Sequence, residues 1–255
     1  MNHFGFRFRT CAVLASVVLL AGSGADAQWG TIKGQVKVVG TLPELPVFVK
    51  EGDPAAKDPS VCAAADIPDE SLVVHPKSNG LANVVICLRQ TPAKIHPDLT
   101  LSKKKEVTVK LKGCRFVPHV LLVRTDQRVR VINEDAAPHN TLRHGRTVVS
   151  GLISANDPEG LLIAVPRNER SPVKVTCDIH AWMEAYWIVL DHPYAAVTNG
   201  QGEFEIADLP EGEHEFSIWQ EKVGYVEKAY KITVKPGVNM LEPIKIASDK
   251  FSETP

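Results

Sequence analysis

Three side chains that bind soft metals lie within seven residues of one another: the thiol of Cys177, the imidazole of His180 and the thioether of Met183. A thiolate with two imidazoles and a long axial thioether is the ligand set of copper electron-transfer sites. Such a site needs a second imidazole from elsewhere in the chain. His139 is the best candidate, because it follows an apolar run that ends in a polar turn. The sequence therefore predicts a copper site made by His139, Cys177, His180 and Met183.

The segments on both sides of this ligand loop are rich in residues that favour β-strands. Residues 173–176 read Val-Lys-Val-Thr, and residues 185–190 read Ala-Tyr-Trp-Ile-Val-Leu. β-branched and aromatic side chains of this kind are enriched in strands. We therefore expect the loop to be the tip of a strand-loop-strand unit, whose rigid ends would hold the donor atoms in place.

Residues 107–190 resemble the cupredoxins, the small blue copper proteins of the plastocyanin and amicyanin kind. The likeness rests on a Phe-x-Pro turn, on Asn133 and Asp135 ahead of His139-Asn140, and on the Cys-x-x-His-x-x-Met spacing, which is similar to the short ligand loop of amicyanin. This resemblance implies a Greek-key β-sandwich that holds one type 1 copper ion. It also implies that the protein carries single electrons, is not an enzyme, and exchanges electrons with a redox protein partner.

The resemblance further suggests roles for residues around the ligands. Asn140 would tie the two ligand loops together by hydrogen bonds. The imidazole of His180 would reach the surface, with Ala181 and Trp182 beside it as an apolar patch for docking the partner. The alternative for Trp182 is that it folds back over the site as part of the core.

Other sites and functions remain open at this level. Cys114 and His119 could join Cys177 and His180 in a closed zinc site, although His139 and Met183 would then have no role. The chain has no nucleophile elbow and no glycine-rich phosphate loop, so no enzyme class is indicated. Two further functions are an envelope or carbohydrate-binding structural module that holds copper for stability, and a copper-delivery protein.

The N-terminus has the features of an export signal. Arg7 and Arg9 precede an apolar run at 11–21, and Ala25-Asp26-Ala27 offers small residues to a signal peptidase. We expect residues 1–27 to be a signal peptide, so the mature chain would lie in the periplasm or the extracellular envelope. No second apolar run is long enough to span a membrane, and the net charge of −1 gives no field that would attract nucleic acid.

Export permits disulfide bonds. Cys11 belongs to the predicted signal, and with Cys177 assigned to the metal, three thiols and three pairings remain. We favour Cys62 with Cys114, because both adjoin turn-like segments. Cys87 lies in an apolar run that predicts a strand buried on both faces, where a free thiol behaves as a small apolar group.

The rest of the chain predicts an all-β protein with a second small β-sandwich. Apolar residues alternate with polar ones in the segments 31–40 and 203–206, which are separated from their neighbours by glycine and proline turns. Residues 51–71 show no period, and we expect an ordered loop there. The patterns at both chain ends resemble the carboxypeptidase regulatory-like, transthyretin-like sandwich. The whole chain resembles a bacterial envelope family labelled methylamine-utilisation proteins.

These patterns divide the chain into four parts. After the signal peptide, residues 28–92 would form the N-terminal part of the regulatory-like sandwich, residues 98–191 the cupredoxin-like copper domain, and residues 192–249 the C-terminal part. Two arrangements are compatible with this order. Either the two chain ends complete one sandwich with the copper domain inserted between them, or the sandwiches follow one another along the chain.

Overall fold

The structure is a computed structural model that describes Met1 and residues 28–251, so almost all of the predicted signal peptide lies outside the described residues. The described part is nearly all β, which confirms the fold class expected from the sequence. Besides its strands it contains one short helix, α1 (Pro59–Cys62), and two 3₁₀ turns, η1 (Pro97–Leu99) and η2 (Ser248–Phe251). Within the described residues, no helix is long and apolar enough to cross a membrane.

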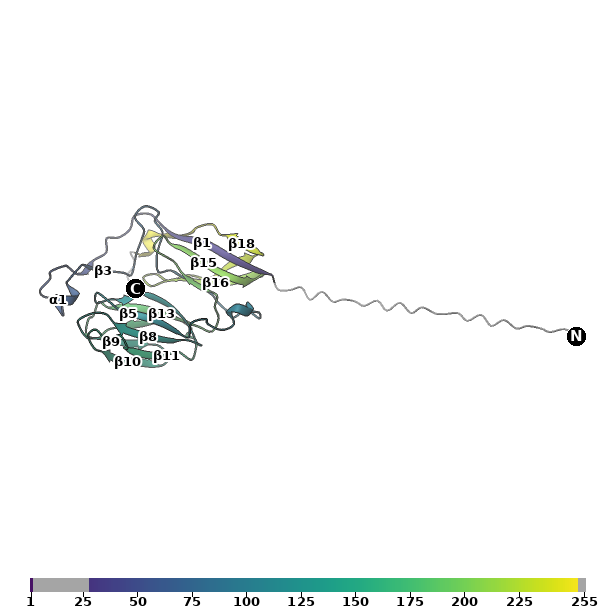
Figure 1. Cartoon of the computed structure of the whole chain (residues 1–255). Coiled ribbons are helices and arrows are strands. Elements are labelled where there is room, and N and C mark those ends of the chain that lie inside the picture. The colour runs from purple at the N-terminus through teal and green to yellow at the C-terminus, as the bar shows by residue number, and fades with distance from the viewer. Residues whose placement is uncertain (2–27, 252–255) are drawn as a thin grey trace.

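The first sandwich is built from both ends of the chain (Figure 1). In one sheet the N-terminal strand pairs antiparallel with β15 and parallel with β18 and β19. The second sheet has the order β14-β4-β16-β17. The strands are β1 (Trp29–Val39), β4 (Val85–Leu88), β14 (Ala195–Val197), β15 (Glu203–Pro210), β16 (Gly212–Gln220), β17 (Gly224–Val234), β18 (Gly237–Met240) and β19 (Ile244–Ala247).

The second sandwich comes from the middle of the chain, shown in teal in Figure 1. One sheet has the order β11-β8-β5-β6, and the other has the order β10-β9-β12-β13-β7. Its strands are β5 (Glu106–Leu111), β6 (Phe116–Val117), β7 (Val120–Arg124), β8 (Arg128–Asn133), β9 (His139–His144), β10 (Val148–Ile153), β11 (Leu161–Ala164), β12 (Val173–Thr176) and β13 (Glu184–Leu190). The parallel pairs β5 with β8 and β7 with β13 show that the chain crosses between the sheets rather than meandering.

Alternating side chains explain why these segments are strands. In β8 the buried residues are Val129, Val131 and Asn133, while the residues between them are more exposed. Each fully buried valine or isoleucine contributes about 1.5–3 kcal/mol to folding. The inner strand β13 has four buried residues out of seven, and Trp187 in it is fully buried.

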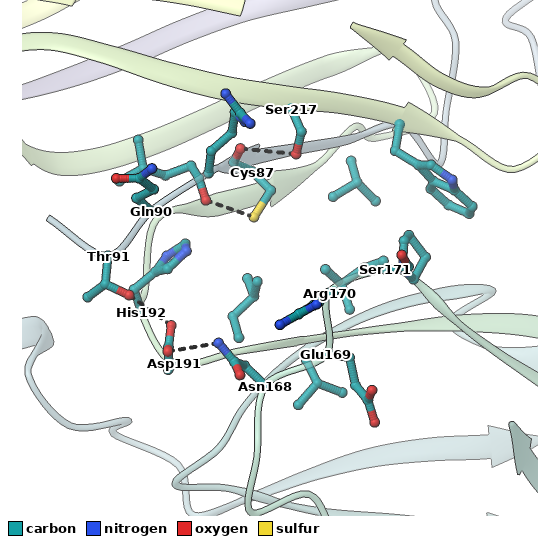
Figure 2. Close-up of a pocket in the computed structure, with 18 of the residues that line it drawn as sticks. Cys87, Gln90, Thr91, Asn168, Glu169, Arg170, Ser171, Asp191, His192 and Ser217 are labelled. Carbon is teal, nitrogen blue, oxygen red and sulfur yellow. Dashed lines mark hydrogen bonds between the residues drawn. The ribbon is translucent and has the colours of Figure 1, made fainter. Parts of the chain in front are cut away.

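The two sandwiches meet at a small apolar junction. Val85, Cys87 and Trp219 of the first pack against Val120 and Ile188 of the second. Beside this contact lies a cavity of about 600 Å³. Its lining side chains come from both units, as Figure 2 shows. The junction therefore joins the sandwiches through side-chain contacts as well as through the connecting chain.

Residues 50–66, which we call the strap, belong to the N-terminal part of the sequence but pack on the second sandwich. The strap is bracketed by the short paired strands β2 (Val47–Val49) and β3 (Ile67–Pro68) and contains α1. Cys62 and Ala63 lie in the same buried cluster as the core of the second sandwich. The predicted loop at 51–71 is therefore ordered, and Figure 1 shows it reaching from the upper sandwich to one end of the lower one.

Candidate metal centre

The four predicted ligand residues come together at one end of the second sandwich. His139 is the first residue of β9, and Cys177 directly follows β12. The loop from Cys177 to Met183 then returns the chain into β13. His139 and His180 are 0% exposed, Cys177 3% and Met183 1%. The predicted strand-loop-strand unit is thus present, with its ligand side chains facing inward.

Three donor atoms converge at this end. The Nδ1 atoms of His139 and His180 lie 3.0 Å apart, and the Sγ atom of Cys177 lies 3.8 Å from Nδ1 of His180. The ligand atoms of these three residues all lie within 4.8 Å of one another. Two imidazole nitrogens and a thiolate form a donor set that suits copper or another soft metal ion. Met183 lies in the same buried cluster as Cys177, and its backbone carbonyl accepts the N–H of Cys177 at 3.2 Å.

Each imidazole is held from behind by a carboxylate. Nε2 of His139 lies 3.0 Å from Oδ2 of Asp135, and Nε2 of His180 lies 3.0 Å from Oδ2 of Asp58. In a neutral imidazole, a carboxylate on the outer nitrogen holds the ring proton there, so that the inner nitrogen can bind a metal. The arrangement therefore presents both Nδ1 atoms to the space beside Cys177.

Asp135 is itself fixed by the backbone. Its two oxygens accept hydrogen bonds from the N–H groups of Gly113 and Cys114, at 2.7 and 2.8 Å. Burial works to raise the pKa of the Asp135 carboxyl, but the hydrogen bonds from His139 and the two backbone groups outweigh it and lower the pKa. Asp135 is therefore ionised where it contacts the imidazole.

The metal-free site pairs a thiolate with an imidazolium. Burial works to raise the pKa of Cys177, but hydrogen bonds from His139 and His180 lower it to about 6. Burial likewise works to lower the pKa of His139, but contacts with Asp135 and Cys177 raise it to about 9. A thiolate is the form of cysteine that binds metal, so Cys177 is already in its binding form near neutral pH.

Hydrogen bonds tie the two ligand loops together. The side-chain N–H of Asn140 donates to Oδ2 of Asp178 at 2.8 Å, and its carbonyl oxygen accepts the backbone N–H of Asp178 at 2.6 Å. Within the ligand loop, the backbone N–H of Met183 donates to the carbonyl of His180 at 3.0 Å. Asn140 thus makes contacts of the kind that the resemblance implies for it.

The surroundings of His180 differ from the sequence-based expectation. Its imidazole does not reach the surface, because the strap covers it and Asp58 binds its outer nitrogen. The ring of Trp182 lies 5.3 Å from the ring of His180, and its N–H donates to the carbonyl of Cys114 at 3.2 Å. Trp182 is therefore half-buried and packed against the core, while Ala181 is exposed.

The alternative zinc site is not assembled. Cys114 forms a disulfide with Cys62, and Nε2 of His119 lies 2.7 Å from a carboxylate oxygen of Glu221. The cysteine that zinc would need is thus used for the cross-link, and the histidine faces the first sandwich. The pairing favoured from the sequence is the one present, and Cys87 and Cys177 are the free cysteines of the described residues.

Asp58 is the residue of this site that sequence reasoning missed. It lies 122 residues before His180 in the chain, inside the segment interpreted as a loop of the other sandwich. The one signal that could have found it is its place four residues before Cys62, since the favoured disulfide brings that stretch to Cys114.

No protein-family model matches the chain, and no curated protein matches its sequence significantly. Several solved structures resemble part of it. A Cu-containing nitrite reductase from Thermus scotoductus is 22% identical with a TM-score of 0.30, over 32% of this chain and 22% of that one. Amicyanin from Paracoccus versutus is 15% identical with a TM-score of 0.29, over 41% and 96%. A purple cupredoxin from Nitrosopumilus maritimus is 17% identical with a TM-score of 0.27, over 32% and 97%.

By their names, the nitrite reductase contains copper and the Nitrosopumilus protein is a cupredoxin, and this chain spans less than a quarter of the nitrite reductase. The likeness covers about a third to two fifths of this chain and is weak. A metal assignment for this chain therefore rests on the donor atoms described above and on their hydrogen bonds.

Proposed function

We propose that this protein is an exported one-electron carrier that holds a single type 1 copper ion. His139, Cys177 and His180 would hold the ion through Nδ1, Sγ and Nδ1, and Met183 would be a weaker fourth ligand. The observation that carries the proposal is the convergence of these three buried donor atoms within 4.8 Å, with a carboxylate behind each imidazole.

The surrounding chain is suited to this role. Copper supplies two oxidation states that differ by one electron, and the protein has to keep the ligands still while the charge changes. The paired strands and the Asn140 contacts fix the loops, and Asp135 and Asp58 fix the rings. The four buried residues exclude water from the site and leave no open position for a substrate. This supports a carrier rather than an enzyme.

Export to the periplasm or the extracellular envelope is part of the proposal. It is supported by the signal-peptide pattern at residues 1–27 and by the disulfide between Cys62 and Cys114. Disulfides form and persist in oxidising compartments and are rare in the cytosol. We infer that the redox protein partner is met there.

The test is an absorption spectrum and a redox titration of the copper-loaded mature protein. We expect an intense visible band from thiolate-to-Cu(II) charge transfer, which disappears on reduction and returns on oxidation by one electron per protein. A colourless protein that binds zinc tightly would overturn the copper assignment.

A second candidate function is a structural module in which the metal stabilises the fold. It is favoured by the closed form of the site, since fully enclosed ligand sets are typical of structural metal sites. Copper delivery is a further possibility that shares this site. Redox titration separates the candidates, because a structural or delivery site needs no reversible couple, and a delivery site would also give up its copper readily to an acceptor.

Met183→Leu is expected to keep the visible band and to raise the reduction potential. A thioether donor stabilises the oxidised ion slightly, so its removal would favour Cu(I), while His139, Cys177 and His180 would still hold the metal. Leucine has nearly the same volume as methionine, so this buried position should tolerate the substitution. Cyclic voltammetry measures the shift. Loss of copper binding in this variant would show that Met183 does more than tune the potential.

Trp182→Ala is expected to slow electron exchange with a redox partner while leaving the visible band in place. The strap covers the outer edge of His180, so this ring cannot meet a partner directly. Trp182 is half-exposed and its ring lies 5.3 Å from the ring of His180. Together with the exposed Ala181 it offers a small apolar contact patch, which is what a short-lived carrier complex needs. Stopped-flow exchange kinetics and thermal melting measure the two effects. A large fall in melting temperature with a shifted spectrum would make Trp182 a core residue only.

A further inference from the structure

The strap reaches the metal centre through one side chain. Asp58 precedes α1 in the left-handed backbone conformation, with φ 52° and ψ 57°. An aspartate in this place commonly caps its helix, but the carboxylate of Asp58 makes no such hydrogen bond. It lies instead against Nε2 of His180, at 3.0 Å.

The strap is anchored so that this contact is held in place. Cys62, four residues after Asp58, is joined to Cys114 of the second sandwich. Hydrogen bonds close the base of the strap, from Gly52 N–H to the carbonyl of Ala63 at 2.8 Å and from Glu51 N–H to Asp66 at 2.8 Å. The disulfide thus fixes the strap to the core of the second sandwich, and the backbone hydrogen bonds join the two ends of the strap.

We propose that Asp58 is a positioning residue for His180 and that the strap is a built-in cover over this imidazole. The carboxylate fixes the ring with Nδ1 turned toward Cys177, and the strap keeps solvent from its outer edge. The positioning role of Asp58 applies to the protein with or without metal. Only the expected effect of Asp58 on copper release rests on the function proposed above.

The contact explains two features that are otherwise unconnected. His180 is 0% exposed although it lies on a short loop at the end of a sandwich. The disulfide joins the strap to Cys114, whose backbone N–H binds the carboxylate that holds His139. One cross-link therefore lies between the supports of both imidazoles, and the two carboxylates act on the two rings in the same way.

The first test uses metal-free protein and hydrogen–deuterium exchange of the ligand loop, residues 177–183. Asp58→Ala should raise the exchange rate of this loop by about tenfold, the size expected when one charge-assisted hydrogen bond is lost. Asp58→Asn keeps the shape and one acceptor, so its effect should be smaller. Asp53→Asn is the matched control in the same segment, because the carboxylate of Asp53 accepts a hydrogen bond from the backbone N–H of Ala55 and lies in the strap like that of Asp58. Equal exchange in the wild-type protein and Asp58→Ala would overturn the proposal.

The second test follows release of copper from the loaded protein to a chelator. Asp58→Ala should weaken copper retention about 10- to 100-fold, as is usual when the partner of a ligating histidine is removed. The Asp53→Asn control should behave as wild type. If the wild-type protein shows no thiolate-to-copper band, the proposed function fails, but the exchange test still decides the role of Asp58. If the band is present and both tests show no change in Asp58→Ala, the positioning role fails alone.

Discussion

The copper-loaded Cys177→Ser variant is expected to lose the visible band completely. The band requires electron density on a thiolate sulfur bound to Cu(II), and a serine hydroxyl stays protonated and binds soft metals poorly. The Sγ atom of Cys177 lies 3.8 Å from Nδ1 of His180. Cys177 is buried, and serine replaces its sulfur by a smaller oxygen atom. We therefore expect the variant to keep its fold and to lose the sulfur ligand.

Cys87→Ser is the matched control for this prediction. Cys87 is also buried and free, but it lies at the junction of the sandwiches, away from the metal centre. Burial, with a contribution from Asp191, raises the pKa of its thiol to about 12, so it is neutral and ill-suited to bind metal. The control should keep the full band. If the band survived in Cys177→Ser and disappeared in Cys87→Ser, the copper would be bound at the junction and not at the candidate metal centre.

The residues that meet at the candidate metal centre could be identified because their spacing is local. Cys177, His180 and Met183 share one loop, and the strands on either side follow from alternating and β-branched residues. His139 required only the further expectation that a second strand ends at the same edge. These are short-range patterns, and the structure places their side chains together.

The strap could not be predicted because its position depends on contacts far apart in the sequence. Nothing in its proline- and alanine-rich composition indicates which sandwich it covers. Its place is set by the disulfide and by the burial of Val49, Cys62 and Ile67 in the second core. The expectation that His180 reaches the surface was wrong for the same reason, since a resemblance limited to residues 107–190 does not include the strap.

The pairing of the two chain ends is a similar case. The alternation in β1 and β15 predicted strands with one buried face but left two arrangements open. The choice depends on the register in which Ile32 lies opposite Ile206 and Gly34 opposite Phe204. There the ring of Phe204 occupies the space where a side chain at Gly34 would lie, so the glycine allows the strands to approach. A close fit of this kind is a property of the assembled sheet and not of either segment.

Removing the disulfide is expected to cause the largest loss of stability. The double variant Cys62→Ser/Cys114→Ser opens a covalent loop with a sequence separation of 52 residues. Without the cross-link the unfolded chain gains entropy, which lowers the free energy of unfolding by ~4 kcal/mol. Placing two hydroxyls in the core would lower it further. Cys87→Ser again serves as the control, because it alters a buried cysteine without removing a cross-link. Urea unfolding of the metal-free proteins measures both changes.

The wild-type protein allows the cross-link itself to be tested, and this test shows whether the stability result reports on the disulfide. Alkylation of unfolded, unreduced protein should label Cys87 and Cys177 and leave Cys62 and Cys114 unlabelled. Label on Cys62 or Cys114 would contradict the pairing. If the pairing holds but the double variant loses less than ~1 kcal/mol, the unfolded chain must already hold the strap near the second sandwich, because only residual structure of that kind reduces the entropy that a cross-link removes. The disulfide would then act chiefly in the folded protein, where it keeps Asp58 against His180.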